Sequence, residues 1–182
     1  MFVLLEGKNV NLRVMEKEDL PLITEWCNNI EFGGEYLSPL QMSRAEIEKS
    51  SESTLFETKV FIIEKKNGGK IGFIWHFNML APYMKMQEIG YALVPSERGK
   101  GYCPEAVQLM VDYLFLTKDI ARIQATTHTE NVASQKVLEK VGLKREGTLR
   151  KTAVIRGEWT DMFILSILRE EWKEPKILAR TV

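Results

Sequence analysis

Residues 93–106 have the sequence LVPSERGKGYCPEA and lie between a predicted strand and a predicted helix. The strand, residues 84–94, alternates Ile89, Tyr91 and Leu93 with Glu88 and two small residues. The helix has an apolar stripe at the spacing i, i+3, i+4, i+7 and i+8, formed by Val107, Met110, Val111, Leu114 and Phe115. Pro104 and Glu105 are typical of a first helical turn. The loop therefore joins the carboxyl end of a strand to the amino end of a helix.

The residues of this loop favour an anionic ligand. The first backbone N–H groups of a helix have no intrahelical partners, and together with the helix dipole they favour an anion by about 0.3 to 1 kcal/mol. Gly99 and Gly101 have no Cβ atom that would block a close approach, and Arg98 and Lys100 add positive charge. A pyrophosphate group fits this description.

Two well-known phosphate-binding loops do not match this stretch. A Walker A loop ending at Gly99-Lys100 needs glycine at the position of Val94 and a hydroxyl residue at that of Gly101. A dinucleotide-binding fingerprint that starts at Gly99 needs glycine or alanine where Pro104 stands. Neither of these loops accounts for the sequence.

The sequence before this unit predicts a strand, a hairpin of two strands and two helices. Residues 8–14 predict a first strand, and residues 59–77 predict a hairpin that turns at Asn67-Gly68-Gly69. The polar residues 43–58 are interpreted as a helix with a surface loop. An amphipathic helix is predicted from four apolar residues at helical spacing: Leu20, Ile23, Cys27 and Ile30.

The sequence after the unit continues the alternation of strands and helices. Residues 121–127 predict a strand, and residues 131–142 predict a short helix that ends at Gly142. Two further strands are expected before Trp172. The predicted fold is mixed α/β with a mainly antiparallel sheet. Since no repeat or low-complexity linker divides the chain, we expect residues 1–182 to form a single domain.

Composition narrows the classes of partner and compartment. The 25 basic and 25 acidic residues of the 182-residue chain cancel, which argues against binding to nucleic acid or to an anionic membrane. Two cysteines are too few for a disulfide framework, and no apolar run is long enough for export or for a membrane span. Only two histidines are present, without a cluster at ligand spacing, so no metal site is expected. These features predict a soluble, cytoplasmic protein whose partner is a small molecule or a local peptide.

Two motifs resemble those of one superfamily. The loop matches R-x-x-G-x-[G/A] over residues 98–103, with Tyr102 inside the motif and Cys103 in place of the final glycine or alanine. Residues 129–150, TENVASQKVLEKVGLKREGTLR, provide a second motif with Asn131 at a helix start and Ser134 three positions on. Both are similar to the GNAT acetyltransferases, and the second and the tail RGEWTDMFILSILREEW resemble the RimJ/RimL-type branch, the ribosomal-protein N-acetyltransferases. The resemblance is strongest from Glu88 to Trp172.

This resemblance implies a GNAT-like fold, in which a mixed, mainly antiparallel sheet flanked by helices is splayed into a V. It also implies acetyl-CoA as cosubstrate, with its pantetheine arm beside the strand that ends at Leu93-Val94 and its pyrophosphate on the loop from Arg98 to Cys103. Asn131 is then expected to hold the pantetheine arm. The implied reaction is direct transfer of the acetyl group to a primary amine, without an acetyl-enzyme.

Catalysis of this transfer requires an oxyanion donor, a base for the amine and a proton for the leaving thiolate. A backbone N–H of Leu93 or Val94 is the expected oxyanion donor. Many relatives carry a tyrosine for the thiolate at the position of Leu138, so Ser134 is the expected substitute, with a solvent-facing serine as the alternative. Glu88 is the expected base, and a structural or substrate-binding carboxylate is the alternative.

The acceptor is left open by these motifs. A protein or peptide N-terminus is favoured over a small amine such as a polyamine or antibiotic, and a non-catalytic acyl-CoA sensor is a further alternative. His128 is interpreted as a turn histidine, while Trp26, Phe32 and Tyr36 belong to the segment expected on the acceptor side. Trp159, in the polar turn RGEWTD, is a candidate for an acceptor contact or for the contact of a homodimer.

Overall fold

The computed structural model describes residues 5–37, 41–51, 58–78, 84–173 and 175. Its described strands form one eight-stranded sheet in the order β1-β2-β3-β4-β5-β6-β8-β7. All neighbouring strands are antiparallel except β5 and β6, which confirms the predicted mixed, mainly antiparallel sheet. The strands are β1 (Leu5–Glu6), β2 (Val10–Val14), β3 (Lys59–Lys65), β4 (Lys70–Asn78), β5 (Met86–Leu93), β6 (Arg122–His128), β7 (Lys144–Ile155) and β8 (Glu158–Leu168).

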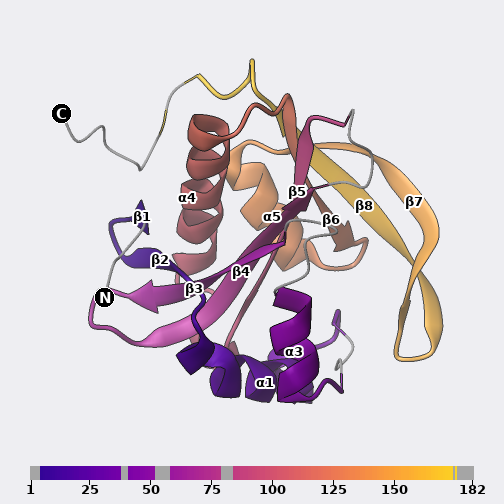
Figure 1. Cartoon of the computed structure of the whole chain (residues 1–182). Helices are drawn as coiled ribbons and strands as arrows, with labels where there is room; N and C mark the ends of the chain where they lie inside the picture. The colour runs from indigo at the N-terminus through magenta and orange to yellow at the C-terminus, as the bar shows by residue number, and fades with distance from the viewer. Residues whose placement is uncertain (1–4, 38–40, 52–57, 79–83, 174, 176–182) are drawn as a thin grey trace.

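Helices cover the two faces of this sheet (Figure 1). The longest is α4 (Tyr102–Thr117), which lies beside α5 (Val132–Val141) on one face, here called the α4 face. The opposite face, here called the α1 face, is covered by α1 (Leu20–Asn28), α2 (Ile30–Gly33) and α3 (Arg44–Ser51). Two short 3-10 helices, η1 (Lys17–Asp19) and η2 (Pro95–Glu97), precede α1 and α4.

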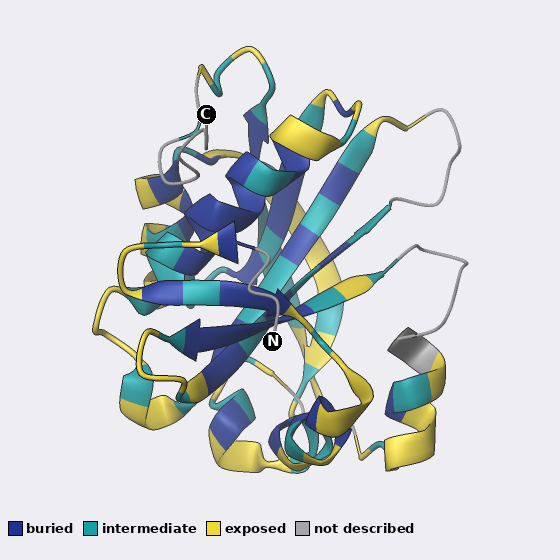
Figure 2. Cartoon of the chain, turned by 60° about the vertical axis from the view of Figure 1, so that its left-hand side comes forward, coloured by how far each residue is buried: buried dark blue, intermediate teal, exposed yellow. Residues whose placement is uncertain are grey.

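The central strands are buried from both sides (Figure 2). On the α4 face, Ile74 of β4 and Ile123 of β6 are fully buried against α4, whose Leu109 and Met110 have no exposed surface. On the α1 face, Ala92 of β5 belongs to a separate apolar cluster with α1, α2 and α3. Because side chains alternate along a strand, Ile89, Tyr91 and Leu93 of β5 share the α4 face, whereas Glu88 and Ala92 share the α1 face.

The sheet splits between β5 and β6. These two strands pair at only three positions, from Met86 with Arg122 to Glu88 with Gln124. Strand β5 nevertheless stays paired with β4 as far as Leu93. Residues 89–93 therefore have a partner on one side only, and the expected V opens immediately after Glu88.

The predicted amphipathic helix through Ile30 is wrong in its extent. The helix α1 ends at Asn28, and Asn29 starts the short helix α2, because its side chain accepts from the backbone N–H groups of Glu31 (2.8 Å) and Phe32 (3.3 Å). Ile30 is consequently 62% exposed instead of continuing the buried stripe. This break turns the chain, so that Phe32 joins Trp26 and Phe73 in a cluster of three mutually stacked rings.

A buried ion cluster fixes the beginning of the fold. Arg13 of β2 contacts Asp19 at 2.8 Å and Glu64 of β3 at 3.0 Å, and Lys70 of β4 reaches Asp19 at 2.6 Å. Burial alone would raise the pKa of Asp19, but the hydrogen bonds from Arg13, from the Glu16 backbone and from Lys70 outweigh it and hold this pKa well below its usual range. The cluster joins β2, β3 and β4 to η1, the short helix that immediately precedes α1 in the sequence.

Candidate functional site

The loop between β5 and α4 requires glycine for a conformational reason. Gly99 has φ +74° and Gly101 has φ +84°, in the left-handed region that side chains disfavour. A Cβ atom built at either position meets no atom within 4 Å, so the surrounding protein does not exclude a side chain there. Gly101 immediately precedes α4, and this backbone conformation presents the open amino end of the helix.

Arg98 holds this loop in place. Its Nε donates to the carbonyl oxygen of Leu93 at 3.0 Å, and its guanidinium also donates to the carbonyl of Phe32. Lys100 pairs with Glu97 at 3.0 Å, and Glu97 also accepts from Lys65 at 2.8 Å. The two basic side chains expected to supply charge are thus already engaged with protein groups, and the backbone N–H groups are the main donors available to an anion.

A cavity of about 730 Å³ lies beside this loop. Its walls are the loop, the end of β5, the first turns of α5 and residues 32–37. It brings together eight of the residues that the two motifs predicted for the site: Leu93, Arg98, Gly99, Gly101, Tyr102, Cys103, Asn131 and Ser134. Val94, Lys100 and Glu88 are not part of its wall. Two segments that lie about thirty residues apart in the sequence therefore form one concave site.

The register of β5 distinguishes the two backbone donors proposed for the oxyanion. The N–H of Val94 donates to the carbonyl of Ile71 at 2.9 Å, so it is not available, which corrects the expectation for Val94. The same bond makes Leu93 and Gly72 a non-hydrogen-bonded pair of the antiparallel ladder. The N–H of Leu93 therefore points away from β4, into the gap where β6 has diverged.

Asn131 is the cap of α5. Its side-chain oxygen accepts from the backbone N–H of Ser134 at 3.0 Å, as the sequence position at a helix start indicates. The amide nitrogen of Asn131 remains as a donor at the cavity wall. Leu138, which stands where many relatives have a tyrosine, is fully buried and packs in the core.

Ser134 meets a residue to which the sequence assigned no role. The hydroxyl of Tyr91 lies 2.9 Å from the Oγ of Ser134 and 3.3 Å from its carbonyl oxygen. Tyr91 is on the unpaired part of β5 and lines the same cavity. The one signal in the sequence was a polar-tipped side chain between Ile89 and Leu93 on an otherwise apolar face.

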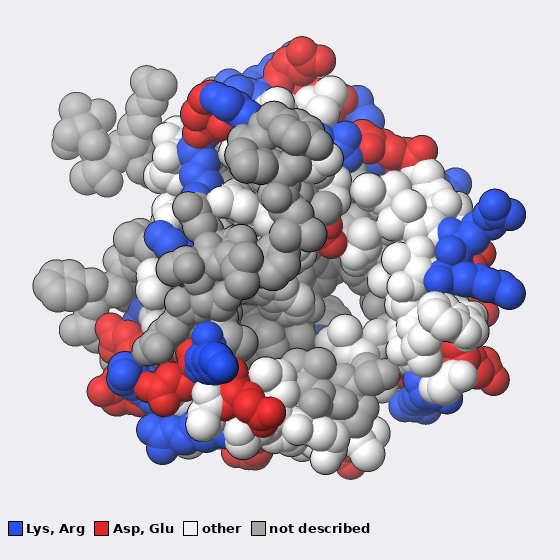
Figure 3. Space-filling model, turned by 45° about the vertical axis from the view of Figure 1, so that its right-hand side comes forward, with Lys and Arg blue, Asp and Glu red and all other residues white. Residues whose placement is uncertain are grey.

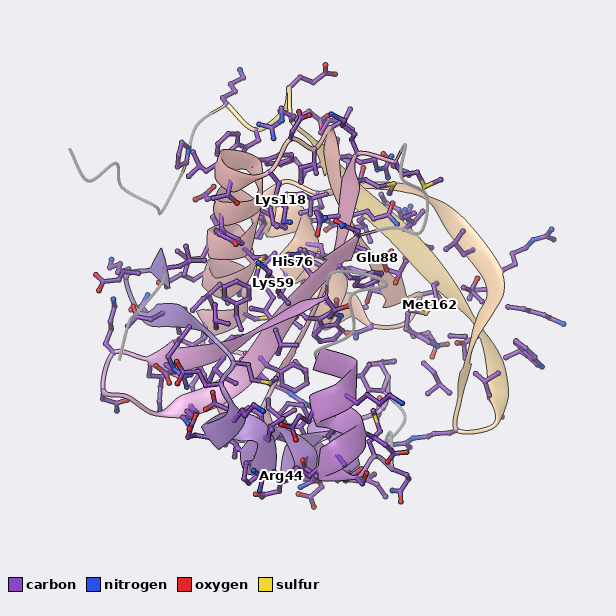
Figure 4. The ribbon with its side chains drawn as sticks, in the orientation of Figure 1. Arg44, Lys59, His76, Glu88, Lys118 and Met162 are labelled. Atoms are coloured by element: carbon purple, nitrogen blue, oxygen red, sulfur yellow. The ribbon has the colours of Figure 1, made fainter. Side chains whose placement is uncertain are left out.

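Glu88 lies at the point where the sheet divides. Its two carboxylate oxygens accept from the Nε2 of Gln124 at 2.8 Å and from the Oγ1 of Thr126 at 3.1 Å, both on β6. Figure 4 shows Glu88 on the side of the central strands nearer to Met162 of β8, whereas His76 lies towards α4. Glu88 is half-buried and belongs to the α1 face, so it approaches the gap from the side opposite to Tyr91.

The margin of the gap on the α1 face is aromatic. The indole of Trp75 lies directly over Gly90, where a Cβ atom would come within 2.2 Å of the ring. The ring of Tyr36 lies against that of His128 in a tilted arrangement, with 5.1 Å between ring centroids, and its hydroxyl donates to the carbonyl of Glu130 at 3.1 Å. The Nδ1 of His128 accepts from the backbone N–H of Glu130 at 3.0 Å, which agrees with a turn histidine.

Cys103 has the character of a structural thiol. Burial raises its pKa to about 12, and Arg98 opposes this only in part. Such a thiol is almost entirely protonated near neutral pH, and it is part of the phosphate-loop wall of the cavity. Its environment therefore favours a wall residue over a nucleophile.

In the described part of the chain, no three His, Cys, Asp or Glu side chains are grouped as metal ligands would be. None of its helices has the length and apolar character needed to cross a membrane.

The profile of the acetyltransferase (GNAT) domain matches residues 9–144. An uncharacterized N-acetyltransferase of Bacillus licheniformis, p20, is 30% identical over 172 residues, which cover 91% of this chain and 96% of p20. The uncharacterized N-acetyltransferase YnaD of Bacillus subtilis is 40% identical over 85 residues, 47% of this chain. The matched part of the chain spans 50% of the length of YnaD.

Solved structures with the same fold include two complexes that contain CoA. A GNAT-family acetyltransferase of Bacillus anthracis is 26% identical with a TM-score of 0.76, covering 92% of this chain and 99% of its own. Mycobacterium smegmatis RimJ in complex with CoA-disulfide has a TM-score of 0.78 at 23% identity, and the match covers 91% of this chain and 85% of the RimJ chain. Spermidine N-acetyltransferase of Vibrio cholerae, in complex with CoA and spermine, has a TM-score of 0.78 at 22% identity, covering 90% and 98%.

The last two likenesses concern the fold alone, whereas the profile match spans most of the chain and p20 is matched over nearly its whole length. The chain therefore belongs to the GNAT acetyltransferase family.

Proposed function

We propose that this protein transfers the acetyl group of acetyl-CoA directly to the α-amino group of a protein or peptide N-terminus, as in the RimJ/RimL-type branch. The observation that carries the proposal is the cavity in which the glycine loop, the unpaired edge of β5 and the first turn of α5 meet. Its volume, about 730 Å³, is within the usual range for small-molecule sites.

The residues of the cavity fit CoA part by part. Backbone N–H groups around Gly99 and Gly101, at the amino end of α4, suit the pyrophosphate. The free edge of β5 suits the amide groups of the pantetheine arm, with Asn131 as a further donor. The N–H of Leu93 would then donate to the thioester carbonyl as it becomes an oxyanion.

The proton transfers are assigned to groups on opposite faces of the sheet. The amine nitrogen attacks the carbonyl carbon, the carbon–sulfur bond breaks, and the amine proton passes to Glu88, directly or through water. The thiolate takes the proton of the Ser134 hydroxyl while the serine oxygen takes one from water, so that no alkoxide remains, and Glu88 returns its proton to solvent. Glu88 lies on the α1 face and Ser134 on the α4 face, so the acceptor and the leaving group occupy different sides of the gap.

Charge near the gap supports a peptide acceptor over a polyamine. Glu88 is surrounded by the neutral donors Gln124 and Thr126, and no second carboxylate contacts it within the described chain. Arg156, at the tip of the β7–β8 hairpin, adds a positive charge nearby, because it donates to the carbonyl of Gly34 and Gly34 lines the cavity. In Figure 3 the central hollow is bordered on its right mainly by uncharged side chains, with both basic and acidic groups further out. A polycation would prefer several carboxylates.

The acidity of the acceptor supports the same choice. An α-amino group has a reference pKa of about 7.7 to 8.0, against about 10.4 for a lysine side chain. At neutral pH the α-amine loses its proton far more readily, and one carboxylate with neutral partners suffices as base.

Release of free CoA thiol, measured with three acceptors, tests the proposal. We expect a peptide with a free N-terminus to react faster than the same peptide that is blocked at its α-amine and contains an internal lysine, and faster than spermidine. Preference for the blocked peptide or for spermidine would refute the acceptor assignment and leave the acetyltransferase intact. Binding of acetyl-CoA without turnover of any of these amines would support a sensor instead.

A further inference from the structure

The contact between Tyr91 and Ser134 joins two elements that the splay has separated. Strand β5 has lost its pairing with β6 three residues before Tyr91, and α5 begins 39 residues after β5 ends, at Val132. The tyrosine side chain crosses from the unpaired edge of β5 to the first turn of α5, and these elements are drawn beside each other in Figure 1. Among the described residues, this is the one hydrogen bond recorded for the Ser134 side chain.

The hydrogen-bonding capacity of the two hydroxyl groups restricts what this contact can do. A phenol has one proton, and it can go either to the Oγ of Ser134 at 2.9 Å or to the carbonyl oxygen of Ser134 at 3.3 Å. If Tyr91 donates to Oγ, the serine proton is free to point into the cavity. A thiolate at the cavity would attract that proton, so it favours this arrangement over the one in which serine donates to tyrosine.

We propose that Tyr91 is a positioning residue for the leaving-group step, which holds the Oγ of Ser134 at the cavity wall with its proton directed towards the departing sulfur. This inference rests on the proposed function and extends it by one residue. Tyr91 itself is not assigned as the proton source, because its hydroxyl faces Ser134 and its one proton is given to the Oγ of Ser134 in this arrangement. The ring of Tyr91 packs against the core of the α4 face, and this packing restricts the position of the hydroxyl group.

The protonation state of Tyr91 agrees with this role. Burial raises the pKa of its phenol well above the usual value; the neighbouring Cys103 adds to this, and the bond with Ser134 opposes it. The hydroxyl therefore stays protonated, and able to donate, at every pH at which the transfer is measured. Burial also shields the contact from water, which would otherwise compete for the serine oxygen.

The test is a double-mutant cycle with Tyr91→Phe and Ser134→Ala. Phenylalanine keeps the ring in the core and removes only the hydroxyl, so we expect the variant to fold and to bind CoA with unchanged affinity. Its kcat should fall by about three- to tenfold, the effect of one lost hydrogen bond, with little change in KM for acetyl-CoA. In the Ser134→Ala background the same change should have no further effect, because the group that it positions is gone.

Tyr113→Phe is the matched control. Tyr113 packs on Phe61 and His76 in the same core cluster and does not line the cavity. Loss of the Tyr113 hydroxyl should leave kcat unchanged. A fall in kcat as large as that of Tyr91→Phe would mean that kcat is sensitive to any loss of a hydroxyl group from this core.

The remaining outcomes distinguish a failure of the positioning role of Tyr91 from a failure of the proposed function. Turnover by Tyr91→Phe within twofold of the parent, or equal effects of Tyr91→Phe with and without Ser134, would overturn the positioning role while leaving the acetyltransferase intact. An active enzyme in which Ser134→Ala has no effect would overturn it as well. Absence of turnover in the parent protein, with CoA still bound, would instead refute the proposed function.

Discussion

Arg98 donates a hydrogen bond from its Nε to the carbonyl oxygen of Leu93, 3.0 Å away, and so ties the phosphate loop to the strand edge beside it. Because the guanidinium also reaches the carbonyl of Phe32, one side chain positions three walls of the cavity. Its contribution to CoA binding is therefore expected to come from geometry more than from charge.

Arg98→Lys should weaken CoA binding about tenfold although the positive charge is kept, because an ammonium group cannot serve both carbonyls in the same fork geometry. Calorimetric titration with CoA measures this change. Lys100→Gln removes a charge whose partner is Glu97 at the surface, and should change the affinity by about threefold or less. A larger loss of CoA affinity in Lys100→Gln than in Arg98→Lys would show that charge, and not geometry, determines the contribution of this loop.

Gly101→Asp should abolish the rise in melting temperature that CoA produces. In the parent protein, binding to the native state alone adds about 2.7 kcal/mol at a hundredfold excess over Kd. The variant strains the backbone and places a negative charge beside the anion. Gly68→Asp is the control, because Gly68 has the same φ of +84° and equally open surroundings but lies in the β3–β4 turn. A CoA-induced shift that survives in folded Gly101→Asp would contradict the cofactor assignment.

Asn131 is expected to have two separable roles. Asn131→Ala should lose about 1 kcal/mol of stability through the missing helix cap, and should also weaken CoA binding. Asn131→Asp keeps the oxygen that accepts from Ser134 but loses the amide donor, so it should retain stability and still bind CoA less tightly. Thermal unfolding and CoA titration of both variants distinguish the roles. If both variants bind CoA as tightly as the parent protein, Asn131 acts only as the helix cap of α5.

Glu88→Gln should slow acetylation of a free N-terminus most strongly at lower pH. There the α-amine is largely protonated and depends on a base, whereas above its pKa of about 8 the amine is already neutral. The ratio of parent to variant kcat/KM, measured from pH 6 to 9, is expected to fall as the pH rises. A ratio that does not change with pH would indicate a structural or substrate-binding carboxylate.

Asp19→Asn should destabilise the fold by about 3 kcal/mol at neutral pH, because it leaves the charge of Arg13 poorly compensated in a buried site. The pKa of Asp19 is lowered in the native protein, so its contribution is present above the unfolded-state pKa of about 3.9 and is lost as the pH falls towards the native pKa. Urea unfolding at several pH values should show the two proteins converging below about pH 4. A constant difference down to pH 2 would contradict this role.

Features encoded by short stretches of sequence could be predicted. The strand and helix around the glycine loop, the end of α5 at Gly142 and the hairpin turn at Gly68 depend on side-chain periodicity and on residues that tolerate positive φ. The boundary between α1 and α2 was missed, because the apolar spacing continued through Asn29 while its side chain favoured a new helix start.

The sequence by itself determined the family, the loop and the cap of α5, since each depends on residues within a few positions of one another. Only the tertiary structure decided which backbone N–H is free and which side chain meets Ser134. The N–H of Val94 is occupied and that of Leu93 is directed into the gap because of the register of β5 with β4, which no local pattern specifies. Tyr91 reaches Ser134, 43 residues away, because β5 and β6 part after Glu88 and α5 lies beside the opening. Such contacts depend on how separate strands and helices pack, and packing joins residues whose spacing in the chain has no regular period.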